Sequence, residues 1–168
     1  MGIEARPEPL EGKLPGISWR WDPETDILSG GFRVRRAGGG LTGTVELADP
    51  LGAIVVLDVS GGVICGLDVV VWPEVETDRT LAAPAGYIDG RVVLHTRPAG
   101  EGVTSLEVDA DLRIAANPAE SVFHLTVGEP RHASVVRAAD HFFIEIDAQH
   151  RLAGFWLTGV PPFIDDAE

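Results

Sequence analysis

The carboxylates of this sequence are the side chains whose spacing comes closest to that of a chemical site. Alternate acids occur in two short segments, at Asp22, Glu24 and Asp26 and again at Glu107, Asp109 and Asp111. Neighbouring carboxylates can bind Ca²⁺ or Mg²⁺, because these hard cations prefer several oxygen ligands. Neither segment has the glycine-punctuated loop of an established calcium site, and an Asp before a Pro, as at Asp22, also commonly opens a turn. Asp22 and Asp26 are therefore candidate ligand-binding residues, and no metal or cofactor is predicted.

Trp19 and Trp21 are a second candidate, because residues two apart on a strand share one face. Two neighbouring aromatic rings could form a platform for a sugar or a peptide, since rigid rings lose little entropy on binding. Burial in the core or in a self-association face is the alternative. Solvent-accessible indole rings would distinguish the platform from the core.

His124 is the candidate histidine. It lies with His132 on either side of the segment 127–131, so the two side chains could meet across a hairpin or stand as separate surface groups. None of the five histidines has the helical i, i+4 spacing or the His-x-His spacing of a metal site. No serine lies in a Gly-x-Ser-x-Gly motif, so no catalytic residue is predicted.

Composition excludes several classes of partner. The net charge of -13 argues against nucleic acid, whose phosphates require a basic surface, and favours a basic protein or peptide. No run of apolar residues is long enough to span a membrane, and the first residues lack the layout of a signal peptide, so a cytoplasmic location is expected. The single cysteine, Cys65, cannot form an internal disulfide.

The elements that must position these residues are short strands. Runs rich in Val, Ile, Leu, Phe and Thr alternate with Gly, Pro and Asp, which predicts an all-β or nearly all-β protein. Alternation is clearest in the segments 44–47, 121–127 and 142–147, and the middle of the chain has a strand of its own at 91–96. A helical turn is predicted at 73–82, an extended arm outside the core at 1–16 and a tail at 163–168.

Internal similarity predicts how the strands are arranged. The segment 106–116 aligns without gaps with 144–154 and more loosely with 56–66, and 21–28 aligns with 116–123. Each of the first three segments is predicted to be a hairpin, although the even-numbered apolar residues of 106–116 also fit one long half-buried strand. One domain, 17–162, would then contain two related halves, about 17–73 and 116–162, joined by 74–115 and packed as a pseudo-symmetric sandwich or barrel. A threefold repeat is the alternative.

These motifs resemble the small bacterial family known as domain of unknown function 2283. That family has an aromatic-Asp-x-x-x-Asp strand start followed by a hairpin of the form Leu-Asp-x-Asp-x-x-Gly-x-x-x-Gly. The matching positions in this sequence are Trp21, Asp22, Asp26, Asp58 and Gly66 in the first half, and Asp147 and Gly154 in the second. The pattern departs from the family at Ser60, Asn117 and Ser121. The resemblance implies a compact β-rich module and no particular activity.

Together these patterns favour a non-enzymatic binding or protein-interaction module whose acidic surface meets a basic protein or peptide. The candidate ligand-binding residues are Trp19, Trp21, Asp22, Asp26 and His124. A metal-dependent hydrolase that uses Asp22 and Asp26, or Glu107 and Asp109, is the alternative. The oligomeric state stays open, and a homodimer is one of the possibilities.

Overall fold

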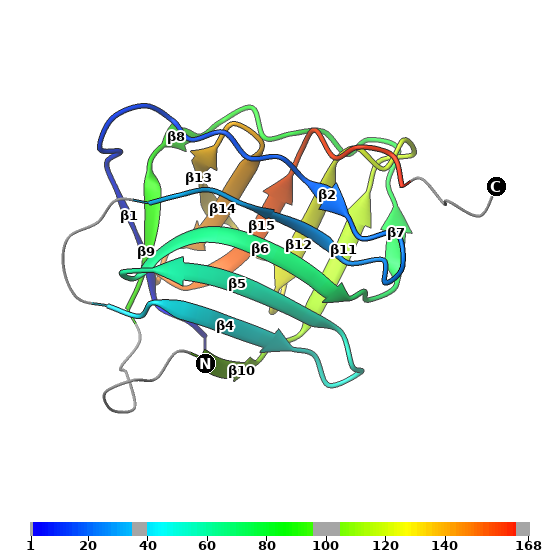
Figure 1. Ribbon diagram of the computed structural model, residues 1–168, viewed down its shortest axis with the longest axis horizontal. Coiled ribbons are helices and arrows are strands. Elements are labelled where there is room, and N and C mark those ends of the chain that lie inside the picture. Colours follow the sequence, from blue (N-terminus) through cyan, green and yellow to red (C-terminus); the bar gives the residue numbers. More distant parts are fainter. Residues whose placement is uncertain (1, 35–39, 96–104, 164–168) are drawn as a thin grey trace.

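The computed structural model describes residues 2–34, 40–95 and 105–163. Within these ranges the chain forms strands and turns and no helix, which confirms the predicted all-β class. The strands belong to two sheets that face each other (Figure 1).

The first sheet has the central order β1-β9-β6-β5-β4-β10, and the short hairpin β2-β3 pairs with β6. Its strands are β1 (Ala5–Glu8), β2 (Arg20–Trp21), β3 (Leu28–Gly31), β4 (Gly43–Ala48), β5 (Ile54–Ser60), β6 (Val63–Val71), β9 (Arg91–Leu94) and β10 (Ser105–Asp109).

The second sheet has the order β7-β11-β12-β15-β14-β13-β8. Its strands are β7 (Val75–Thr77), β8 (Ile88–Asp89), β11 (Leu112–Ala116), β12 (Phe123–Val127), β13 (Ala133–Ala139), β14 (Phe142–Asp147) and β15 (Leu152–Leu157). In Figure 1 its strands lie behind the first sheet and cross it at a large angle.

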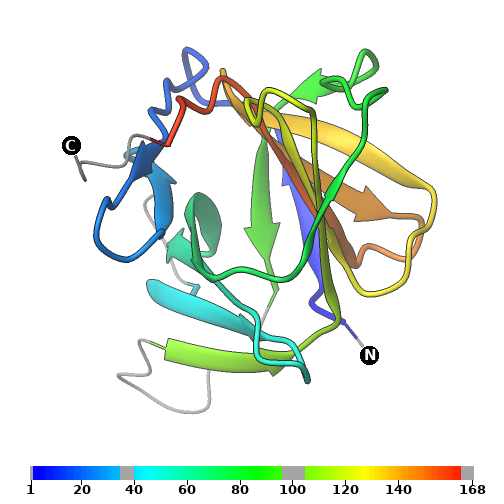
Figure 2. The same ribbon diagram turned by 90° about the vertical axis from the view of Figure 1, so that its right-hand side faces the viewer.

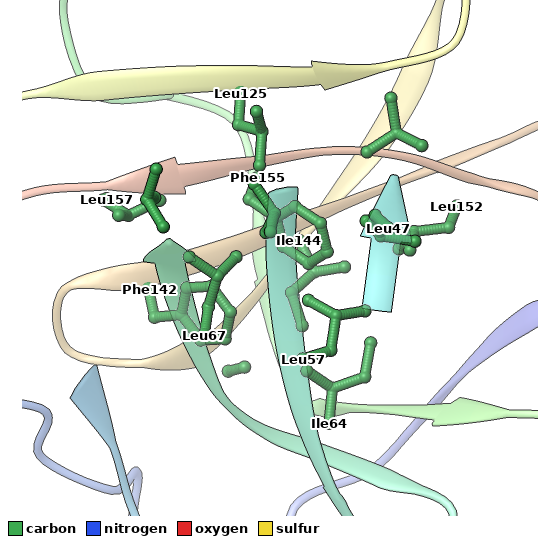
Figure 3. Packing of buried hydrophobic residues seen from close by; sticks show 14 of the residues in the cluster. Leu47, Leu57, Ile64, Leu67, Leu125, Phe142, Ile144, Leu152, Phe155 and Leu157 are labelled. Atoms are coloured by element: carbon green, nitrogen blue, oxygen red, sulfur yellow. The ribbon is translucent and has the colours of Figure 1, made fainter. Parts of the chain in front are cut away.

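The hydrophobic core fills the space between the sheets. Alternate residues of each strand point inward, so Leu57 and Leu67 from the first sheet meet Phe142, Ile144 and Phe155 from the second (Figure 3). All five side chains are fully buried. Burial of each side chain contributes about 1.5–3 kcal/mol to the stability of the fold. Hydrophobic burial in this shared core is therefore the main interaction that holds the two sheets together.

The same strand order occurs in both sheets. The first contains the series β2-β3-β6-β5-β4, and the second contains β11-β12-β15-β14-β13, with every neighbouring pair antiparallel. Followed along the chain, each series begins with a hairpin (β2-β3 or β11-β12), continues with a single strand (β4 or β13) and ends with a second hairpin (β5-β6 or β14-β15). The second hairpin pairs with the single strand on one side and with the first hairpin on the other. This order is what two related halves would require, and their origin by duplication stays a prediction.

The predicted hairpins at 56–66 and 144–154 are confirmed as β5-β6 and β14-β15. The hairpin predicted at 106–116 is wrong, because β10 pairs with β4 in the first sheet whereas β11 pairs with β12 in the second. The even-numbered residues of 106–116 all pack toward the core, so the chain bends at Ala110 and Asp111 and crosses between sheets instead of turning back. The alternative of one long half-buried strand is closer to the structure.

Two other predictions also need correction. The segment 1–16, expected to be an arm outside the core, is in its described part tied to the core at its start, since Ile3 and Ala5 are buried and β1 pairs with β9. The segment 73–82 is not helical but contains the edge strand β7, because Val75, Glu76 and Thr77 pair with β11. The strands predicted at 44–47 and 142–147 are confirmed. Those predicted at 121–127 and 91–96 are confirmed as the shorter strands β12 (Phe123–Val127) and β9 (Arg91–Leu94), and residue 96 lies outside the described residues. Of the predicted tail 163–168, only Phe163 lies within the described residues.

Candidate functional site

Four separate segments of the chain meet at one end of the molecule. They are the β2-β3 loop, the β11-β12 loop, the segment that follows β6 and the segment that follows β15; Figure 2 looks onto this end. Together they line a hollow of about 330 Å³, here called the aromatic hollow. Its lining residues are Trp21, Asp26, Trp72, Val75, Glu120, Phe123 and Phe163.

The aromatic rings of this hollow form a flat stacked pair with a perpendicular neighbour. Trp21 and Trp72 lie nearly parallel, with ring centroids 5.5 Å apart and planes inclined by 22°. Phe163 stands at 79° to Trp21 with its centroid 5.4 Å away. Phe123 is buried and packs against both tryptophans, so it joins the site to the core. Pairs of this kind are worth about 0.5–1.5 kcal/mol beyond the area they bury.

Hydrogen bonds fix the orientation of both indoles. The Nε1–H of Trp21 donates to the carbonyl of Pro161 at 2.8 Å, and that of Trp72 donates to the carbonyl of Asp26 at 2.8 Å. A ligand would therefore meet the faces of these rings and not their N–H groups.

The two loops that bring carboxylates to the hollow close in the same way. The N–H of Asp22 donates to the carbonyl of Ile27 at 2.8 Å, and the N–H of Asn117 donates to the carbonyl of Val122 at 3.1 Å. Each loop also contains one residue with left-handed backbone, Asp26 at φ 60° and Glu120 at φ 53°. These are the acids that line the hollow.

In each loop the side chain of the first residue accepts hydrogen bonds from backbone N–H groups of the same loop. The Asp22 carboxylate accepts a hydrogen bond from the N–H of Glu24 at 2.9 Å, which lowers the pKa of Asp22. The side-chain oxygen of Asn117 accepts from the N–H groups of Ser121 at 2.8 Å and Val122 at 3.0 Å. Asp22 thus positions the loop and does not itself line the aromatic hollow.

A second hollow of about 440 Å³ adjoins the first, and Trp72 lines both. It is here called the acidic hollow, because its lining contains three acidic residues, Asp49, Glu74 and Glu76, and one basic residue, Arg113. The edge strand β7 runs between the hollows and contributes Val75 to one and Glu76 to the other. This end of the molecule therefore combines exposed apolar surface with five carboxylates.

Two of the predicted ligand-binding residues lie elsewhere. Trp19 is only 4% exposed, donates its indole N–H to the carbonyl of His141 and packs edge-on against Phe142 in the core. His124 lies on the outer face of the second sheet, where its Nε2 is 2.7 Å from a Glu145 oxygen. Its ring stacks on Trp156 at 4.1 Å.

The carboxylates of the alternative metal site are spread out. Glu107 and Asp109 are exposed on β10, which forms one edge of the first sheet. Across residues 2–34, 40–95 and 105–163, no three His, Cys, Asp or Glu side chains are arranged to hold a metal ion. No helix in these ranges is long and apolar enough to cross a membrane.

Comparisons with known proteins do not extend this picture. No family model matches the sequence, and no curated protein matches it either. The resemblance to the domain of unknown function 2283 therefore stays a prediction.

Sequence reasoning found Trp21 and Asp26 and missed the rest of the aromatic hollow. The alignment of 21–28 with 116–123 held part of the missing signal, because it places Glu120 and Phe123 in a loop equivalent to that of Asp26. A second signal is that Trp72 and Phe163 both lie beside a proline shortly after a hairpin. Neither pattern shows that the four segments meet.

Proposed function

We propose that the protein is a non-enzymatic interaction module that binds a basic segment of a partner at the end formed by the aromatic and acidic hollows. The observation that carries the proposal is the convergence of four aromatic rings and two carboxylates in one hollow. Aromatic faces attract cations with about 0.5–2 kcal/mol, and neighbouring carboxylates add the opposite charge.

Charge supports a basic partner. The lining of the two hollows contains one basic residue, Arg113, and five acidic residues: Asp26, Glu120, Asp49, Glu74 and Glu76. The whole chain carries a net charge of -13, which speeds encounter with a positively charged partner at low salt.

The shape supports a short extended segment. Two shallow adjoining hollows offer room for a few side chains, with Trp72 between them. For a contact of that size anchored by tryptophan we expect a dissociation constant on the order of micromolar.

A fluorescently labelled short peptide of alternating lysine, arginine and valine tests the proposal. We expect saturable binding by anisotropy, a change in tryptophan emission, and loss of affinity as salt rises, because salt screens the acidic hollows. A peptide with glutamate in place of each basic residue should not bind.

The double variant Asp26→Asn and Glu120→Gln should weaken binding about tenfold or more, because it removes both carboxylates of the aromatic hollow. Its matched control is Glu107→Gln with Asp109→Asn, which removes the same charge from β10. Equal loss in both variants, or no binding of the basic peptide to the unmodified protein, would refute the proposed function.

A further inference from the structure

We infer that the aromatic hollow is a receptor for an arginine side chain of the partner. This inference rests on the proposed function and adds to it the identity of the cation. It depends on the shape of the aromatic surface, on the state of the two carboxylates and on how the chain binds one of its own arginines.

The aromatic surface is flat. Trp21 and Trp72 stack with their planes only 22° apart, and Phe163 stands nearly perpendicular to Trp21 on one side. A planar guanidinium stacks well on such a face. A rounded ammonium or methylated ammonium is bound best by rings that surround it, and a stacked pair does not form such an enclosure.

The carboxylates of the hollow are free to bind a donor. Within the described residues, neither Asp26 nor Glu120 makes a side-chain hydrogen bond or an ion pair, although both line the hollow. A guanidinium offers five N–H donors in a rigid fork, so it can stack on an indole and bind carboxylates at its edge at the same time.

Two backbone carbonyls at the indoles already accept a hydrogen bond. The carbonyls of Asp26 and Pro161 each accept an indole N–H, so they contribute less to binding a new donor. A lysine ammonium is strongly hydrated and would need several acceptors to replace its lost water. A trimethylated lysine has no N–H with which to use the carboxylates.

The same combination of groups binds Arg137 elsewhere on this chain. The Arg137 guanidinium lies over the ring of Tyr87, 4.9 Å from its centroid. Its Nε and Nη2 groups donate hydrogen bonds to the two carboxylate oxygens of Asp89, at 2.7 and 3.0 Å. An aromatic face with a carboxylate at its edge is therefore an arrangement that binds a guanidinium in this molecule. The aromatic hollow presents the same arrangement on a larger scale.

The test uses short peptides that carry one lysine near each end and differ only at the central residue, which is arginine, lysine, trimethyllysine or citrulline. We expect the arginine peptide to bind at least tenfold more tightly than the lysine and trimethyllysine peptides. Citrulline has the shape of arginine without its charge, so the citrulline peptide should bind more weakly still.

The variant Phe163→Ala should retain the preference for arginine over lysine, because it removes the perpendicular ring and leaves the stacked pair on which the guanidinium lies. This side chain is 39% exposed, so the variant should fold normally, as circular dichroism would verify. The double variant Asp26→Asn and Glu120→Gln should abolish the preference.

The outcomes separate the two proposals. Equal or tighter binding of the lysine or trimethyllysine peptide would overturn the arginine assignment and leave the proposed function intact. Failure of every peptide to bind would overturn both.

Discussion

Trp72 contributes to more of the proposed site than any other side chain, because it stacks on Trp21 and lines both hollows. Its indole N–H also binds the carbonyl of Asp26, so the ring helps to position the loop that presents the Asp26 carboxylate. Large, oriented aromatic side chains of this kind commonly dominate binding energy at interfaces. A single residue after β6 thus links the geometry of the loop to the surface that a partner would meet.

Cys65 gives a prediction that is independent of any ligand. Burial, together with the charge of Asp58, raises the pKa of the Cys65 thiol from its ordinary 9.0 to about 11. At pH 8 the thiolate fraction is therefore about 100-fold lower than in an exposed cysteine, and the thiolate is the reactive form. We expect the folded protein to react with a disulfide reagent at least 100-fold more slowly than the protein unfolded in guanidinium.

Reaction at equal rates in the folded and unfolded protein would show that the half-buried Cys65 thiol is not held neutral by its surroundings. Repeating the measurement from pH 8 to pH 10 checks the cause. The rate in the folded protein should still be rising at pH 10, whereas in the unfolded protein it should be approaching its plateau.

At the level of elements, the β11-β12 loop depends on Asn117. Its side chain accepts hydrogen bonds from the N–H groups of Ser121 and Val122 and donates to the Ser121 hydroxyl. The variant Asn117→Ala should lower the free energy of unfolding by about 1 kcal/mol, because two half-buried backbone donors lose their partner. It should also weaken binding of the basic peptide, since Glu120 lies in this loop.

Thermal denaturation measures the first effect and anisotropy the second. The control is Asn117→Asp, which keeps the oxygen that accepts from Ser121 and Val122 and should retain most of the stability. If Asn117→Ala were as stable as the unmodified protein, the loop would be held by its backbone alone.

The strands themselves could be predicted from the sequence. Alternation correctly placed Phe142, Ile144 and Ile146 on the core face of β14 and Glu145 on the opposite face. The segment 106–116 could not be assigned in this way, because similar local sequences either turn back or cross to another sheet. Which one occurs depends on the neighbouring strands, and His150 with φ 58° turns where Leu112 continues into β11.

The site was less predictable than the fold for the same reason. Trp21 and Asp26 lie in one conspicuous motif, whereas Phe163 is distant in sequence and packs against Trp21, whose indole N–H donates to the carbonyl of Pro161. Contacts of this kind leave no periodic pattern. The sequence therefore pointed to a binding site without showing its full set of residues.

For the whole molecule, the shared core predicts unfolding in one step. A single cluster of buried side chains includes residues of both sheets. Within the described residues the chain crosses between the sheets three times, between β6 and β7, at Gly90 and at residues 110–111. Differential scanning calorimetry should show one transition whose calorimetric and van't Hoff enthalpies agree. Two separate transitions would mean that the halves fold independently.

Two pairings in the first sheet join strands that are far apart in the chain. Glu8 of β1 pairs with Arg91 of β9, and Thr44 of β4 pairs with Ser105 of β10. While the polypeptide is being synthesised, β1 and one edge of β4 therefore stay unpaired until the ribosome has released β9 and β10. During this interval their unpaired backbone groups can pair with other chains. The risk of aggregation, and therefore the need for a chaperone, is greatest before synthesis is complete.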